Sequence, residues 1–198
     1  DQLWEALGLG ETKRIVGMAK YRDPELEYTS WNTTEGEPWW EDSAIPESRK
    51  VPLEPNYHQL VGVIKCLGWM TTKRGGLIAD EVGVGKTGQV IMSLLMYFQL
   101  LQAQQLNVSF PPQLGIPATA QLSADPVVIS LGSDYKTAFR KEGVPTKSAD
   151  RDFTLFTRKF SVAIFDEVHE LRNLGPRNTA AIGLARCSSS TICLTATP

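Results

Sequence analysis

The sequence contains little cysteine and no long apolar run. Only three cysteines occur among 198 residues, Cys66, Cys187 and Cys193, and none of them stands in CxxC spacing. A disulfide framework and a zinc site are therefore not expected, and a reducing compartment fits. The longest apolar stretch, residues 90–101, is interrupted by polar residues and is shorter than the roughly 20 residues that a membrane-spanning helix needs. No signal-peptide pattern opens the chain, so neither a membrane protein nor a secreted one is expected.

What remains is the composition of an ordinary globular protein, with 42% hydrophobic and 21% charged residues. The charge is uneven: residues 1–57 carry twelve acidic and six basic side chains, whereas residues 58–198 carry ten and fourteen. Four of the five tryptophans also lie in the first part. We therefore divide the chain into an acidic, tryptophan-bearing extension, 1–52, and a domain, 53–198. The extension is expected to pack on the domain or to bind a protein partner, and packing is favoured because exposed tryptophan clusters are uncommon.

In the domain, segments with a helical period alternate with short apolar segments. The first helix is expected to start at Asn56, a residue type that caps helices well. Strands that alternate with helices predict an α/β fold, in which helices flank both faces of a mainly parallel sheet. The expected helices are 56–70, 87–103, 134–142 and 179–186, the expected strands are 77–79, 127–130, 162–165 and 191–194, and 104–124 is expected to be a surface loop.

A glycine-rich turn between the first strand and the second helix has the composition of a phosphate-binding loop. Gly83 and Gly85 allow the backbone to turn tightly, so that successive N–H groups point at phosphate oxygens near the positive end of the helix. Lys86 supplies a positive charge, and the Thr87 hydroxyl can bind Mg²⁺. The residues expected to bind the nucleotide here are Gly83, Val84, Gly85, Lys86 and Thr87.

An acidic pair follows the expected strand 162–165. Asp166 and Glu167 stand at the end of that strand, where neighbouring strand ends of an open α/β sheet converge on ligands. Asp166 can hold Mg²⁺ on the phosphates, and Glu167 can deprotonate an attacking water. His169 is expected to transmit the state of the nucleotide.

Three strings in this order carry a family resemblance: IADEVGVGKT (78–87), FDEVHELRN (165–173) and LTATP (194–198). Together they resemble the first, ATP-binding lobe of the SWI/SNF-type (sucrose-non-fermenting) helicase-like ATPases of superfamily two. The resemblance implies a RecA-like P-loop NTPase lobe over residues 53–198. It assigns Gly83, Gly85, Lys86 and Thr87 to motif I, Asp166, Glu167 and His169 to motif II, Thr195, Ala196 and Thr197 to a coupling motif III, and Gln59 to the reading of adenine.

The family also implies a biochemical activity. Its members use ATP and Mg²⁺, hydrolyse ATP to ADP and phosphate in a DNA-dependent way, and act on double-stranded DNA or chromatin in remodelling or DNA repair. A nuclear location is implied by the resemblance alone. The chain begins without Met and stops at motif III, so we expect a fragment without the second lobe. Because that lobe supplies an arginine finger, which contributes ~10³–10⁵ in rate, hydrolysis by the fragment is expected to be weak or undetectable.

The sequence departs from the family pattern at several positions. Asp80 stands where the pattern GxxxxGK[ST] has its first glycine, and Ala196 stands where most members have glycine. Only one strand, 127–130, is expected between motifs I and II, so the lobe is expected to be incomplete. The resemblance implies that Ser130 and the turn after it approach the phosphodiester backbone of DNA. Basic side chains follow the strand 127–130 or precede motif II, but their mild positive charge is by itself also that of a solvated surface. They are Lys136, Arg140, Lys141, Arg158 and Lys159.

Two other interpretations stay open at this point. The chain can be a catalytically dead relic or a protein-interaction module with a vestigial nucleotide site, which the missing strand and second lobe favour. It can also be another superfamily-two helicase or another P-loop NTPase. The intact Lys86, Asp166 and Glu167 argue against the relic, and LTATP after DEVH argues against a switch NTPase.

Overall fold

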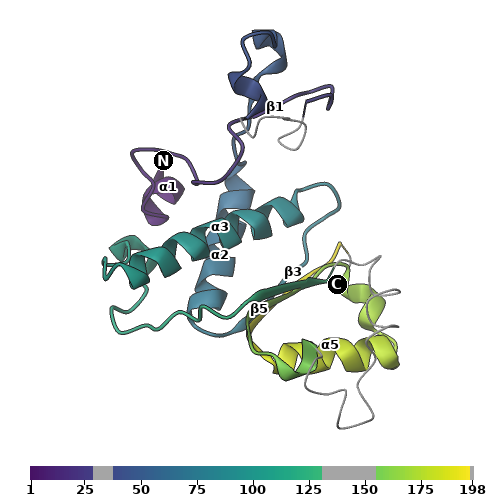
Figure 1. Cartoon of the computed structure of the whole chain (residues 1–198). Coiled ribbons are helices and arrows are strands. Elements are labelled where there is room, and N and C mark those ends of the chain that lie inside the picture. Colours follow the sequence, from purple (N-terminus) through teal and green to yellow (C-terminus); the bar gives the residue numbers. More distant parts are fainter. Residues whose placement is uncertain (29–37, 131–154, 197–198) are drawn as a thin grey trace.

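The computed structural model describes residues 1–28, 38–130 and 155–196. Its centre is a sheet of four parallel strands in the order β3-β6-β5-β4 (Figure 1). Because the strands are parallel and in close register, their carboxyl ends lie side by side along one edge. The strands are β3 (Gly75–Ile78), β4 (Val127–Ser130), β5 (Phe160–Phe165) and β6 (Ser188–Leu194).

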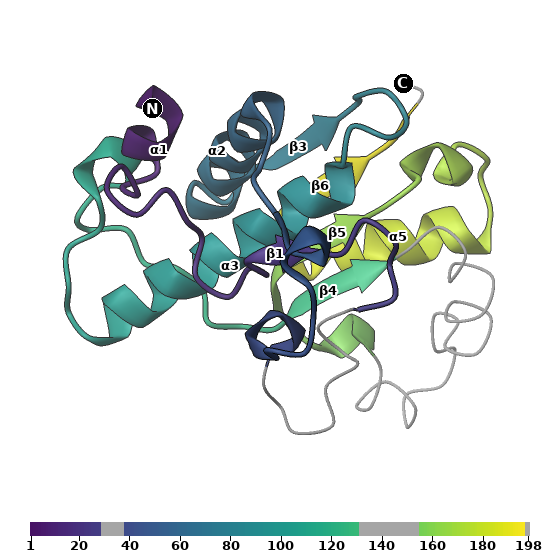
Figure 2. The same ribbon diagram turned by 90° about the horizontal axis from the view of Figure 1, so that it is seen from above.

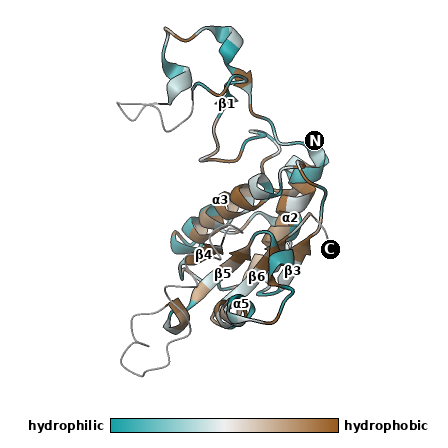
Figure 3. Cartoon of the chain, turned by 90° about the vertical axis from the view of Figure 1, so that its right-hand side faces the viewer, coloured by the Kyte–Doolittle hydropathy of each residue, from teal (hydrophilic) through white to brown (hydrophobic). Residues whose placement is uncertain are grey.

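Helices cover both faces of this sheet. The helices α2 (Tyr57–Thr71) and α3 (Lys86–Gln105) pack on one face, and α5 (Pro176–Arg186) packs on the other (Figures 1 and 2). The side chains of β5 alternate accordingly: Val162 and Ile164 join the core under α2 and α3, whereas Ala163 and Phe165 join the core under α5. Figure 3 shows these strands as a mostly hydrophobic layer between the helices. The predicted α/β fold, in which helices flank a mainly parallel sheet, is confirmed.

The two long helices form where the sequence predicts them. Asn56 precedes α2, and its backbone N–H donates to Gln59 Oε1 at 2.9 Å, which closes the first turn. Helix α3 runs two residues past its predicted end, and the side chain of Gln104 bonds to both the N–H and the carbonyl of Leu122. The predicted surface loop 104–124 therefore starts as helix and is tied back to it, with Leu122 buried.

The N-terminal residues behave in two ways. After α1 (Gln2–Ala6), Leu7 and Ile15 are fully buried in the core that α2 and α3 share with the sheet. A second segment, residues 19–28 and 38–55, projects away from the lobe (Figures 1 and 3). Its base is an antiparallel ladder of β1 (Tyr21–Arg22) and β2 (Val51–Pro52), and it contains the 3₁₀ turns η1 (Trp39–Glu41) and η2 (Glu47–Arg49). We call this segment the projecting unit.

An ion cluster and an aromatic cluster hold the projecting unit together. The guanidinium of Arg49 binds the carboxylates of Asp23, Glu25 and Glu27, while the rings of Trp39 and Tyr28 stack at 5.8 Å. Burial alone would raise the pKa of Asp23, but three backbone N–H groups and Arg49 outweigh burial and hold this pKa below its usual value. The domain boundary at residue 52 stays a prediction.

Several expected features lie outside the described residues. These include the helix 134–142 with Lys136, Arg140 and Lys141. Between β3 and β5, the part of the chain that the structure describes contains one strand, β4, where it was predicted. No helix among the described residues is long and apolar enough to cross a membrane.

The remaining elements are short. They are the 3₁₀ turns η3 (Pro112–Leu114), η6 (Leu155–Thr157) and η7 (Val168–Leu171).

Candidate functional site

The glycine-rich loop lies between the end of β3 and the start of α3, as predicted. Gly83 and Gly85 both adopt positive φ, +84° and +79°, which only glycine adopts without strain. Gly85 is also the residue that precedes the first turn of α3, a helix of 20 residues. The N–H groups of a long helix and of the preceding turn are therefore available at this loop, which suits the binding of an anion.

Lys86 is anchored to the loop itself. Its Nζ donates to the backbone carbonyls of Asp80 at 3.0 Å and Glu81 at 2.9 Å. The ammonium group is thereby held over the loop by the chain's own backbone. A phosphate oxygen would bind this ammonium in place of one or both carbonyls, because a charged acceptor makes the stronger hydrogen bond.

Two side chains in the first turn of α2 contact the backbone of the glycine loop. Gln59 Nε2 donates to the carbonyl of Val84 at 3.3 Å, and His58 Nε2 lies 3.0 Å from the same oxygen. Since Gln59 Oε1 accepts the N–H of Asn56, both polar atoms of this carboxamide are engaged within the chain. The structure therefore places Gln59 beside the loop, and its role toward adenine stays a prediction. His58 was missed at the sequence level because nothing in its spacing distinguishes it from a surface histidine.

The acidic pair begins directly after β5. Asp166 Oδ1 accepts the backbone N–H of Glu167 at 2.9 Å, and Glu167 takes a left-handed backbone conformation with φ of +51°. A non-glycine residue in this conformation is uncommon and turns the chain sharply away from the strand. The turn brings Glu167 Oε2 to 3.1 Å from His169 Nδ1.

Thr195 joins the three motif segments. Its backbone N–H donates to the carbonyl of Ile78, the last residue of β3, at 3.0 Å. Its hydroxyl lies 3.3 Å from His169 Nδ1, and the residue is only 2% exposed. Because β6 lies between β3 and β5 in the sheet, the residue after β6 contacts both neighbours. The phosphate loop, the acidic pair and motif III therefore meet at the carboxyl edge of the sheet.

His169 Nδ1 has polar neighbours on both sides. Glu167 Oε2 lies 3.1 Å from it and the Thr195 hydroxyl 3.3 Å from it. The ring of His169 therefore lies between the acidic pair and the residue that follows β6.

The remaining predicted residues are less informative. Thr87 is exposed and Ala196 is half-buried, while Thr197 lies outside the described residues. Ser130 ends β4, and Arg158 and Lys159 are exposed just before β5. The structure does not bring these residues to the site through any contact of the described side chains.

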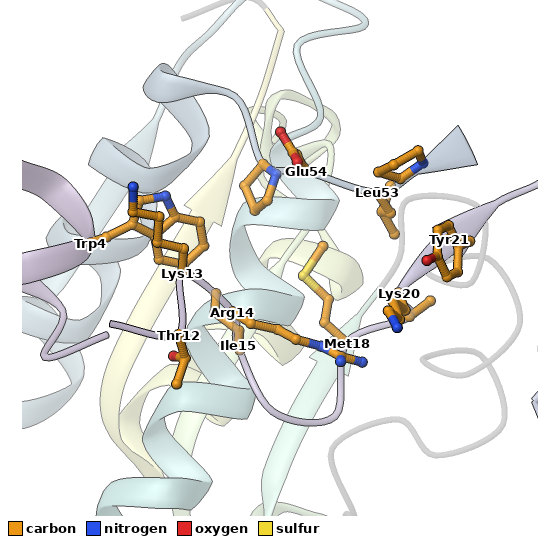
Figure 4. A pocket seen from close by; sticks show the side chains of 13 residues that line it. Trp4, Thr12, Lys13, Arg14, Ile15, Met18, Lys20, Tyr21, Leu53 and Glu54 are labelled. Atoms are coloured by element: carbon orange, nitrogen blue, oxygen red, sulfur yellow. The ribbon is translucent and has the colours of Figure 1, made fainter. Parts of the chain in front are cut away.

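Two cavities lie near the first turn of α2. One, of about 290 Å³, is lined by α2, β3 and the start of the loop, with Asp80 and Gln89 in its wall. The other, of about 230 Å³, lies between the N-terminal segment and residues 52–55 (Figure 4). Trp4 and Tyr21 stand at its two ends, and no residue of the loop or of the acidic pair lines it. The first cavity adjoins the candidate site, and the second does not.

The residues at this edge of the sheet could supply some of the ligands of a Mg²⁺ ion that binds together with a nucleotide. No group of three or more His, Cys, Asp or Glu side chains within the described ranges could hold a metal ion by itself. Thr87 and Asp166 offer the hard oxygen ligands that Mg²⁺ prefers, and Mg²⁺ commonly takes its other ligands from phosphates and water. A magnesium site here therefore requires a bound phosphate.

Comparisons with known proteins give a distant likeness. No protein-family model matches the sequence, and no curated protein matches it. Among solved structures, the chain is similar to the Sulfolobus solfataricus SWI2/SNF2 ATPase core in complex with dsDNA, with a TM-score of 0.43 and 16% sequence identity. The match covers 74% of this chain and 32% of that chain, so this chain spans about a third of that ATPase core.

Proposed function

We propose that the chain is the ATP-binding first lobe of a DNA-dependent ATPase of the SWI/SNF type. The observation that supports this proposal best is the meeting of three segments at one sheet edge. Thr195 bonds to Ile78, the residue of β3 from which the glycine loop starts, and its hydroxyl lies 3.3 Å from His169 Nδ1. His169 in turn lies 3.1 Å from Glu167 of the acidic pair. A glycine turn with an accidental Lys-Thr pair would not require the other two segments to converge on it.

In this proposal the loop holds the phosphates. The backbone N–H groups from Gly83 to Thr87 and the ammonium of Lys86 bind the phosphate oxygens, with the positive end of α3 behind them. Binding of the phosphates releases Lys86 from its loop carbonyls. Gln59, already at the loop, is placed to bind the adenine if its carboxamide exchanges one of its present partners.

The acidic pair divides the remaining tasks. Asp166 and Thr87 hold Mg²⁺, which neutralises charge on the phosphates. Glu167 accepts a proton from the attacking water. Through His169 and Thr195 a change at Glu167 is transmitted to the end of β6, which is the coupling role of motif III. Ala196 and Thr197 complete that motif.

The activity of the whole protein belongs to the same proposal. It would hydrolyse ATP while moving on double-stranded DNA or chromatin in the nucleus, in remodelling or DNA repair, with an arginine from a second lobe completing the site. Ser130 and the segment after it would contact the phosphodiester backbone. The acidic projecting unit offers a surface for a protein partner.

The direct test is a Mg²⁺-dependent titration with a fluorescent ATP analogue. Wild type should bind saturably, and Lys86→Ala should lose binding because its ammonium is the one positive side chain anchored to the loop among the described residues. Lys159→Ala, exposed before the amino end of β5 and so at the opposite end of the strands, is the matched control and should bind as wild type does. Glu167→Gln should retain binding and abolish any hydrolysis.

Circular dichroism of each variant separates binding from folding. If folded Lys86→Ala binds the analogue as tightly as wild type, the phosphate-loop assignment is wrong. If folded wild type binds no nucleotide, the chain is a relic or an interaction module.

A further inference from the structure

We propose that Gln89 is a positioning residue of the phosphate loop, which it holds through the side chain of Asp80. This inference rests on the proposed function, because it concerns the same loop. It assigns a role to a residue that sequence analysis passed over, and it explains how the loop can lack its usual first glycine.

The side chain of Gln89 is fully buried at the junction of α2, α3 and the loop. It is 0% exposed, although it is polar and lies on the second turn of α3. Its Nε2 lies 3.5 Å from Asp80 Oδ2, at the long limit of a hydrogen bond. The carboxylate can only accept, so the amino side of the carboxamide faces Asp80.

The other side of the carboxamide lies against α2. A Cβ added to Gly62 would come within 1.9 Å of Gln89 Oε1, so glycine at this position is what admits the side chain. Gln89 Oε1 accepts no hydrogen bond from the described residues. A buried polar group with an unmet acceptor costs free energy, so a purely structural position would be expected to hold an apolar side chain.

Two residues of α3, one turn apart, hold the same residue of the loop. Lys86 Nζ donates to the backbone carbonyl of Asp80, and Gln89 contacts its side chain. Residues i and i+3 of a helix share a face, so both side chains reach Asp80 together. A glycine in place of Asp80 would offer only its backbone to this helix.

This double attachment has a consequence for nucleotide binding. When a phosphate takes Lys86 away from the carbonyls, Gln89 is the α3 residue that still holds Asp80. The start of the loop then stays in place while Lys86 changes partner. Loss of the Gln89 contact should therefore weaken binding of the nucleotide, since the loop must be ordered at the moment of binding.

The test exchanges the carboxylate of Asp80 and the carboxamide of Gln89. In Gln89→Glu, a buried carboxylate faces the carboxylate of Asp80, an exposed residue, and we expect the affinity for the ATP analogue to fall ~10-fold or more. The double variant Asp80→Asn, Gln89→Glu restores one donor and one acceptor, with the amide now on the loop. It should recover affinity to within ~3-fold of wild type. Gln102→Glu, on the exposed part of α3, is the matched control and should bind as wild type does.

Rescue by the double variant provides a readout that lost packing alone would not change. If Gln89 only filled space, adding Asp80→Asn to Gln89→Glu would restore nothing, because it changes no volume at position 89. The same exchange is measured on the free energy of unfolding without nucleotide, as a double-mutant cycle between Asp80 and Gln89.

The outcomes separate the inference from the function. A double variant that binds no better than Gln89→Glu and shows no coupling in unfolding overturns the role of Gln89. A wild type that binds no nucleotide overturns the proposed function. In that event the unfolding cycle alone decides whether Gln89 holds Asp80.

Discussion

The contact between the glycine loop and α2 can be tested by adding a single methyl group to either loop glycine. Gly83 and Gly85 have nearly the same positive φ, but their surroundings differ. A Cβ on Gly83 would have no neighbour within 4 Å, whereas a Cβ on Gly85 would stand 2.3 Å from Gln59 Nε2. Alanine at either position costs about 1–2 kcal/mol for the left-handed backbone. Only alanine at Gly85 also displaces Gln59.

The additional loss can be estimated from the contact that breaks. Gln59 is flexible enough to move away, but it then gives up its hydrogen bond to the carbonyl of Val84. One such bond contributes about 1 kcal/mol. Gly85→Ala should therefore destabilise the chain by about 1 kcal/mol more than Gly83→Ala. The unfolded-state entropy that alanine removes is the same for both and cancels in the difference.

Urea unfolding followed by tryptophan fluorescence and circular dichroism measures this difference. With a slope of about 1–3 kcal/mol per molar urea, the two midpoints should differ by roughly 0.3–1 M at equal slope. In a Gln59→Ala background the difference should vanish, because no carboxamide is left to displace. Equal midpoints for the two variants, or a difference that survives in Gln59→Ala, would refute the contact between α2 and the loop.

Three further predictions concern other parts of the chain. Thr195→Val should lower the free energy of unfolding by about 1 kcal/mol and change the NMR signals of the His169 ring, because the hydroxyl at 3.3 Å from Nδ1 is lost. The lowered pKa of Asp23 stabilises the fold above its unfolded value of 3.8, and this stabilisation disappears as the pH falls through the folded pKa. Asp23→Asn should therefore remove an acid-dependent step from a fluorescence-monitored pH titration. Burial raises the pKa of Cys66 to about 11, so mass spectrometry after iodoacetamide treatment at pH 8 should find Cys187 alkylated before Cys66.

The helices could be predicted because the spacing of their apolar residues reflects which face is buried. In α2, apolar residues recur every three or four positions and are the ones that face the core, so both ends of the helix were predicted to within one residue. The strand β3 was harder. It begins at Gly75 and Gly76, two residues that local preference assigns to a turn, and its pairing with Thr191 to Leu194 overrides that preference. The order of the strands depends on such distant pairing and was not available from local pattern.

In the candidate site, too, local pattern predicted some features, and others depend on contacts between distant segments. Motif order predicted the loop and the acidic pair, since both depend on residue types at fixed spacing. The link through Thr195 and His169 depends on which strand lies between β3 and β5 and could not be predicted locally. Gln89 was missed because a polar residue on a helix normally faces water, and its burial becomes evident only when Gly62 of α2 is placed opposite. The catalytic roles of the motif residues stay predictions.

The ladder at the base of the projecting unit makes that unit an insertion with adjoining ends. Tyr21 pairs with Pro52 and Arg22 with Val51, so the chain leaves the lobe and returns to it at neighbouring points. Paired Cα atoms of antiparallel strands are about 5 Å apart, a distance that a two-residue turn spans. A two-residue turn in place of residues 23–50 would therefore keep Arg22 and Val51 at their present separation. The points where the chain leaves the lobe and returns to it are thus set by the ladder and not by the length of the segment between them.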